Sequence, residues 1–167
     1  MLVNNLILSK LDYGNAVLAA CTVADLNALQ VIMNNAVRFI LDVNKRSHIT
    51  PYLKKLHFLP VKQRILYKLC LLAYKIMNHT APQYLLDIFQ CYQPTTAMSL
   101  RHATEIERDF LLITYTDNTE LSNKSIFQRL IRSWNSLPLS LRITNDIDAF
   151  KRELKTFYFK QAFESDS

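Results

Sequence analysis

The most regular hydrophobic pattern in the chain runs from residue 60 to residue 78. Its apolar side chains recur at spacings of three and four positions: Val61, Ile65, Leu69, Leu72 and Ile76. A second apolar row lies beside the first: Leu66, Cys70, Ala73 and Met77. Two adjacent rows form a wide apolar arc, which is typical of a helix enclosed by its neighbours. The pattern therefore predicts a central core helix of about five turns.

Similar spacing predicts further helices on both sides of the central one. Residues 1–13, 23–40, 126–134 and 145–158 each place their apolar side chains on one face. Thr22 and Asp25 form a variant of the capping box, and Asn145 is a candidate cap for the last helix. Thr50 followed by Pro51 predicts the start of a short helix before Pro60, and Pro82 starts another that extends through Phe89.

Strand character is confined to one short run. Residues 110–116 combine aromatic and β-branched side chains, whereas 138–142 reads as a tight turn. The fold class expected is mainly α, an irregular bundle of five or six helices with at most one small β element near residues 110–116. Three parts are predicted: a helical bundle over 1–92 built on the 60–78 helix, a linker over 93–109, and a C-terminal helical segment over 110–167 that packs back on the bundle.

Composition narrows the function classes. The chain has 167 residues and one glycine, Gly14, so glycine-rich phosphate loops and most all-β folds are excluded. Cys21, Cys70 and Cys91 are widely spaced and odd in number, which indicates thiols in a reducing compartment and not a disulfide framework or zinc knuckle. No apolar run approaches the length of a membrane span. An intracellular protein, in the cytoplasm or nucleus, is expected.

The formal net charge of +6 is unevenly distributed. Residues 43–86 contain no Asp or Glu, and we call this segment the basic block. It carries eight basic residues: Lys45, Arg46, Lys54, Lys55, Lys62, Arg64, Lys68 and Lys75. Unopposed positive charge of this kind suits phosphate backbones or anionic lipid, although a run of like charge is more often a solvated face.

Catalytic constellations are poor in this sequence. Glu105, Glu107 and Asp109 alternate along a charged stretch, and no two acidic residues are adjacent. His48 and His57 have no neighbouring Cys or carboxylate with which to form a zinc site or a triad. No catalytic residue, metal or cofactor is therefore expected.

Nucleic-acid binding has positive support. Arg64, Lys68 and Lys75 share one sector of the central helix, with Tyr67 and Tyr74 alongside, and such interleaving can neutralise phosphates and stack bases. The alternative is that the rings pack while the basic groups meet solvent. The candidate binding residues are Lys45, Arg46, Lys54, Lys55, Lys62, Arg64, Tyr67, Lys68, Tyr74 and Lys75.

Several short motifs occur in a recognisable order. The first group comprises Ser9-Lys10-Leu11-Asp12-Tyr13, Leu29-Gln30 with Asn34, Ala36 and Arg38, and His48-Ile49-Thr50-Pro51 with Leu56-His57-Phe58-Leu59-Pro60-Val61 and Arg64-Ile65. The second group comprises Tyr74-Lys75, Ala81-Pro82-Gln83-Tyr84-Leu85, Trp134-Asn135-Ser136-Leu137-Pro138 with Leu141-Arg142, and Phe150-Lys151 with Leu154-Lys155. Over roughly residues 7–163 this order resembles the region downstream of the reverse-transcriptase core in LINE-type (non-long-terminal-repeat, chicken-repeat or jockey-like) retrotransposon polyproteins.

The resemblance implies a helical, thumb-like segment of an RNA-directed DNA polymerase that holds template and primer. It carries over no catalytic residue, because the paired aspartates of the polymerase palm, expected upstream, and an endonuclease domain are both missing from this sequence. The expected partners are RNA or an RNA–DNA duplex and an upstream palm if the chain is part of a longer one, with no membrane. The alternative is a structural or protein-interaction helical module without activity of its own.

Overall fold

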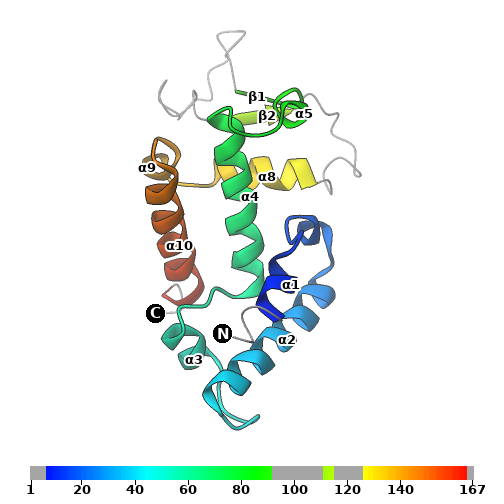
Figure 1. Ribbon diagram of the computed structural model, residues 1–167, viewed down its shortest axis with the longest axis vertical. Helices are drawn as coiled ribbons and strands as arrows, with labels where there is room; N and C mark the ends of the chain where they lie inside the picture. The colour runs from blue at the N-terminus through cyan, green and yellow to red at the C-terminus, as the bar shows by residue number, and fades with distance from the viewer. Residues whose placement is uncertain (1–6, 92–110, 115–125, 165–167) are drawn as a thin grey trace. The chain divides into compact units, whose positions relative to one another are not determined.

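The computed structural model describes residues 7–91, 111–114 and 126–164 (Figure 1). It is mainly helical, as predicted, and the described residues divide into two compact units. Unit 1 comprises residues 1–68 and 152–167, and unit 2 comprises residues 69–151. The long helices α4 (Val61–Met77) and α10 (Ile147–Phe163) each contribute residues to both units.

Unit 1 is assembled around α2 (Val23–Leu41), with α1 (Ser9–Asp12) drawn beside it in Figure 1. A 3₁₀ turn, η2 (Val17–Ala20), joins them, and α3 (Thr50–Lys55) packs on α2. The predicted capping box at the start of α2 is confirmed: the Asp25 amide donates to the Thr22 hydroxyl, and the Asp25 carboxylate accepts from the Thr22 amide. The Thr22 hydrogen bonds lower the pKa of the Asp25 carboxyl, because they favour its charged form.

The start of α4 is tied to α2 by one side chain. The Val61 amide, which no earlier turn of α4 satisfies, donates to Gln30 Oε1 at 2.8 Å. The predicted apolar arc of α4 is confirmed, since Val61 and Ile65 are buried in unit 1 and Leu69, Cys70, Ala73 and Ile76 are buried in unit 2.

Three of the described helices are followed within two residues by a left-handed residue that is not glycine. Asp42, His57 and His79 have φ values of 49°, 50° and 53°. After α3 the His57 amide donates to Lys54 O and the Phe58 amide to Leu53 O, which is the Schellman pattern. His79 and Thr80 repeat this pattern after α4. Glycine is the usual residue at this position, so a chain with one glycine uses His and Asp there.

Unit 2 contains a small two-stranded antiparallel sheet. Strand β1 (Phe89–Cys91) pairs with β2 (Leu112–Thr114), with Phe89 opposite Thr114. Helix α8 (Ile126–Asn135) supports β2, because the Asn135 amide donates to Leu112 O and accepts from Leu112 N, both at 3.1 Å. A side-chain amide thus satisfies the strand backbone as a neighbouring strand would.

An aromatic cluster forms the centre of unit 2. Trp134 and Phe150 have no exposed surface, with ring centroids 6.0 Å apart. Tyr74 stacks on Phe150 at 4.3 Å, and its hydroxyl donates to Asn145 O at 2.7 Å. Aromatic side chains bury large apolar areas, so this cluster contributes strongly to the stability of unit 2.

Several local predictions need correction. The described residues contain eight α-helices, more than the five or six expected, and the unpredicted one is α9 (Leu139–Arg142), where the sequence reads as a tight turn. The short helix predicted after Pro82 is present as α5 (Gln83–Leu86). The small β element is present near residues 110–116, but Phe89 lies in its partner strand and not in a helix. Asp146, and not Asn145, caps α10 by accepting from Asp148 N and Ala149 N. Ile49 occupies the N-cap position of α3, so Thr50 is its first residue and makes no cap hydrogen bond.

The two units differ from the predicted three-part division. Their boundaries lie within α4, after Lys68, and within α10, after Lys151. The N-terminal part of each of these helices therefore belongs to one unit and the C-terminal part to the other. The predicted linker over 93–109 lies outside the described residues. Among the described helices, none has both the length and the apolar composition required to cross a membrane.

Candidate nucleic-acid interface

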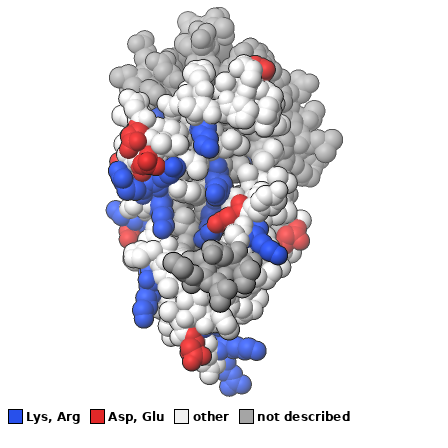
Figure 2. All heavy atoms as spheres, viewed as in Figure 1, with Lys and Arg blue, Asp and Glu red and all other residues white. Residues whose placement is uncertain are grey.

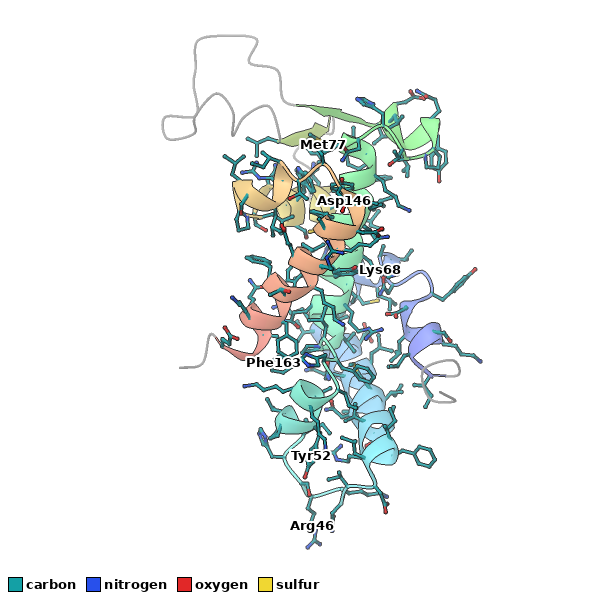
Figure 3. The ribbon with its side chains drawn as sticks, turned by 60° about the vertical axis from the view of Figure 1, so that its left-hand side comes forward. Arg46, Tyr52, Lys68, Met77, Asp146 and Phe163 are labelled. Carbon is teal, nitrogen blue, oxygen red and sulfur yellow. The ribbon has the colours of Figure 1, made fainter. Side chains whose placement is uncertain are left out.

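Most basic groups of the basic block are exposed. The exposed members are Lys45, Arg46, Lys54, Lys55, Lys62 and Lys75. Arg46 projects from the loop between α2 and α3 (Figure 3). All except Lys75 belong to unit 1, so unit 1 holds most of the cationic side chains predicted to bind phosphate.

Lys54 has partners within unit 1. Its ammonium donates to the carbonyl oxygen of Phe163 at 3.2 Å and lies 5.6 Å from the centre of the Phe163 ring. These contacts join α3 to the end of α10. A cation held by a carbonyl and an aromatic face keeps its charge, but it must give up this geometry to bind a phosphate directly.

Arg64 is not an unopposed cation, although its own segment is free of acids. Arg64 Nε donates to Asp12 Oδ1 at 2.9 Å, and a second nitrogen pairs with the other carboxylate oxygen. The pair is partly buried, with the Arg64 and Asp12 side chains 19% and 29% exposed. Acidic side chains also lie next to basic ones on the face drawn in Figure 2. The predicted contact of Arg64 with phosphate would therefore compete with its ion pair to Asp12.

Tyr74 cannot act as the predicted base-stacking residue. It is 3% exposed, and its ring already stacks on Phe150 in unit 2. Burial, with a smaller contribution from the nearby negative charge of Asp146, raises the pKa of the Tyr74 hydroxyl. The Tyr74 ring is therefore packed inside the aromatic cluster. This is the alternative that the sequence left open, in which the Tyr rings pack while the basic groups meet solvent.

Tyr67 has the opposite environment. It lines a pocket of about 490 Å³ in unit 1, which we call the unit 1 pocket. The pocket is lined by Leu8, Ser9, Asp12, His57, Phe58, Leu59, Arg64, Tyr67, Lys68 and Lys155. Lys68, labelled in Figure 3, projects from α4, and Lys155 comes from α10. Neither ammonium has an ion-pair or hydrogen-bond partner within the described part of the chain.

Seven residues of the unit 1 pocket are absent from the predicted binding set, and three of these have titratable side chains: Asp12, His57 and Lys155. Each lies in a motif that carries the family resemblance, and this is the signal that could have identified them. Their approach to Lys68 depends on contacts between distant segments, such as the pair between Asp12 and Arg64, which are 52 positions apart. Spacing within one helix does not report such contacts.

The His57 ring has a defined setting at the pocket wall. Its centroid lies 5.5 Å from that of Phe159, at an angle of 35° between the ring planes. The backbone of His57 is in the left-handed region, which costs a residue with a Cβ about 1–2 kcal/mol. Strain of this kind is a reason to consider a role for the side chain.

Metal and catalytic groups are sparse. Within residues 7–91, 111–114 and 126–164, no group of three or more His, Cys, Asp or Glu side chains is placed to hold a metal ion. The predicted acidic stretch at Glu105, Glu107 and Asp109 lies outside these ranges. Comparison with protein-family profiles, with curated proteins and with solved structures finds no significant match to this chain. The residues themselves therefore carry the functional argument.

Proposed function

We propose that this protein is a non-catalytic nucleic-acid-binding segment that holds RNA or an RNA–DNA duplex through basic residues of unit 1. The proposal includes its origin as the post-palm region of a LINE-type reverse transcriptase, working inside the cell, in the cytoplasm or nucleus. Its main support is the set of exposed cations on α3, the preceding loop and α4, within a segment that contains no Asp or Glu. Neutralising phosphates with Lys and Arg is the dominant source of affinity for nucleic acids.

The family resemblance gives independent support. The motifs around Asp12, His57, Arg64 and Lys155 contribute side chains to one pocket, although they are far apart in the chain. Primer extension by the purified chain is expected to be absent, because the resemblance carries over no palm aspartate. The polymerase chemistry would belong to an upstream palm, if one precedes this segment.

Salt dependence tests the proposal. Fluorescence anisotropy with a labelled RNA–DNA duplex should give an affinity that falls steeply with salt, since each neutralised phosphate contributes a slope of about 0.9 in log K against log [salt]. Replacing Lys55, Lys62 and Lys68 of unit 1 with Gln should reduce this slope by roughly two to three.

The matched control removes the same charge outside the basic block. Lys10, Arg152 and Lys160 are exposed, and their replacement by Gln also lowers the net charge by three. The proposal expects a clearly smaller loss of affinity in this control. Absence of binding at low salt, or equal losses in the two triple variants, would contradict it.

The second candidate function is a protein-interaction module, and one observation favours it. Helix α2 exposes Val31, Ile32 and Phe39, which are 56%, 48% and 79% exposed. Exposed apolar side chains grouped on one helix are typical of a surface that contacts a partner. This candidate predicts oligomers in light scattering that disappear when Ile32 and Phe39 become Asn and Ser, without any dependence on nucleic acid.

A further inference from the structure

The unit 1 pocket has the charge of an anion site. Among its described lining residues, Arg64, Lys68 and Lys155 are the cations and Asp12 is the one carboxylate, so these four side chains have a net charge of +2. The carboxylate is held by Arg64 in a two-point ion pair, so it opposes that cation directly. Lys68 and Lys155 remain without partners among the described residues, and these two ammonium groups are the cations available to a ligand.

The size of the pocket indicates more than a phosphate alone. About 490 Å³ lies within the range of roughly 300–1,000 Å³ that small-molecule sites occupy. A concave site of this volume holds a nucleotide unit. The sugar–phosphate backbone of a continuous duplex lies on a convex surface, whereas the end of a strand can enter a pocket.

The aromatic lining suits a base. Tyr67, Phe58 and His57 all line the pocket; Tyr67 and Phe58 are half-buried residues and His57 is exposed. Stacking of a base on an aromatic side chain is worth about 1–3 kcal/mol and tolerates any base. The pocket therefore combines ammonium groups that can bind a phosphate with aromatic side chains on which a base can stack, and a nucleotide contains both groups.

The charge also distinguishes between kinds of phosphate. A terminal phosphate monoester carries about −1.5 to −2 at pH 7, as phosphorylated side chains do, whereas an internal diester carries a single negative charge. The two ammonium groups of Lys68 and Lys155, which have no partner among the described residues, balance the monoester more closely than the diester.

We propose that the unit 1 pocket binds a strand end bearing a terminal phosphate, with the phosphate at Lys68 and Lys155 and the terminal base against Tyr67 and His57. This inference rests on the proposed function and specifies the part of the nucleic acid that unit 1 recognises. It assigns to Lys155 and His57 a binding role that their sequence context alone did not give.

The test compares two oligonucleotides that differ at one end. A single-stranded trinucleotide with a 5′-phosphate and the same trinucleotide with a 5′-hydroxyl, each labelled at the 3′ end, are titrated against the full chain by fluorescence anisotropy. A 3′-phosphorylated trinucleotide labelled at its 5′ end reports which terminus is recognised. Tighter binding of one phosphorylated end, by about tenfold, supports the inference, because each charged hydrogen bond contributes strongly. Equal affinity for phosphorylated and hydroxyl ends overturns it.

Two matched pairs of variants locate the site. Lys68→Gln and Lys155→Gln should each remove most of the phosphate preference. Lys62→Gln on α4 and Lys160→Gln on α10 change the same charge on the same helices outside the pocket, and should preserve the preference. Loss of the preference in all four variants, or in none of them, overturns the assignment.

A further variant is expected to gain affinity, and a gain of affinity cannot be explained by misfolding. Asp12→Asn removes the one carboxylate of the pocket and leaves the Arg64 guanidinium unopposed. The affinity for the phosphorylated end should rise by about fivefold, as expected for one charge at a distance of several ångströms in a partly solvated site. An unchanged or lower affinity counts against the inference.

The outcomes separate this inference from the proposed function. Duplex binding without a preference for a phosphorylated end leaves the proposed function standing and overturns the pocket assignment. If no oligonucleotide binds, the proposed function fails, and the pocket is tested with adenosine monophosphate against adenosine by calorimetry. Binding of the monophosphate alone then supports the pocket, and equal or absent binding overturns it.

Discussion

Two identical dipeptides on α4 have opposite environments. Tyr67–Lys68 and Tyr74–Lys75 lie two helical turns apart, and their spacing of seven places them near the same helix face. In unit 1, Tyr67 lines an open pocket with Lys68. In unit 2, Tyr74 is stacked on Phe150 and buried. The residues that cover the helix therefore decide whether a Tyr contributes to the core or to a surface site, and the dipeptide itself does not.

The largest expected effect is on stability, and it tests whether Phe150 forms the core of unit 2. Phe150→Ala removes a fully buried ring that contacts both Tyr74 and Trp134, and should lower the free energy of unfolding by about 3–5 kcal/mol. Urea denaturation followed by Trp134 fluorescence measures it. Phe58→Ala, at the wall of the unit 1 pocket, is the matched variant and should cost clearly less, because Phe58 is only half-buried. Similar losses of stability in the two variants would contradict the assignment of Phe150 to a core and of Phe58 to a pocket wall.

A smaller effect is expected at Tyr74. Tyr74→Phe keeps the stacked ring and removes the hydrogen bond to Asn145 O, so stability should fall by about 1 kcal/mol. Affinity for nucleic acid should stay unchanged, since the hydroxyl is occupied inside unit 2. Denaturation measures the change in stability, and anisotropy on the same preparation measures the affinity for nucleic acid. Weakened binding would show that Tyr74 contacts the ligand.

Two histidines with the same backbone geometry give a further contrast. Relief of the left-handed strain by His57→Gly or His79→Gly is worth about 1–2 kcal/mol, and the greater freedom of glycine in the unfolded chain offsets about 0.4–1 of it. Each variant should therefore be stabilised by roughly 0–1.6 kcal/mol, and by less for His57→Gly, which also loses the ring contact with Phe159. Only His57→Gly should weaken binding of the phosphorylated trinucleotide, because His79 is not a pocket residue. Equal affinities of the two variants would remove His57 from the site.

The smallest effect is an alkaline pH dependence. Because the pKa of Tyr74 is raised in the folded state, its contribution to stability is complete below the unfolded value of 10.0 and is lost as the pH rises through the folded pKa. Wild-type protein should therefore lose more stability above pH 10 than Tyr74→Phe does. Denaturation at pH 9 and pH 11 measures the difference, and parallel losses would contradict it.

Local patterns were sufficient to predict the long helices. The rows of apolar residues on α2, α4, α8 and α10, and the capping pair Thr22 and Asp25, are properties of contiguous sequence, so they predicted these elements. Strand β1 was missed because Phe89 follows a helical turn, and its strand conformation depends on pairing with Thr114. Asn135 shows the same limit, since its role is to hold the backbone of Leu112.

The candidate site was predictable only in part. Lys68 and Tyr67 followed from their positions on the central helix, whereas the pairing of Arg64 with Asp12 joins segments that no helical period connects. Tyr74 was misassigned for the same reason, because the ring that covers it belongs to α10. Periodicity reports which residues share a face, and tertiary contacts determine what that face meets.

Two single substitutions in the repeated dipeptides test the assignment of Lys68 to the binding site most directly. Lys68→Gln and Lys75→Gln remove the same charge from the same helix, and their affinities for the 5′-phosphorylated, the 3′-phosphorylated and the unphosphorylated trinucleotide are measured by anisotropy. Lys68→Gln should weaken binding of the preferred phosphorylated end by about tenfold, whereas Lys75→Gln should change it by less than about twofold. Equal losses in the two variants, or a greater loss for Lys75→Gln, would contradict the assignment.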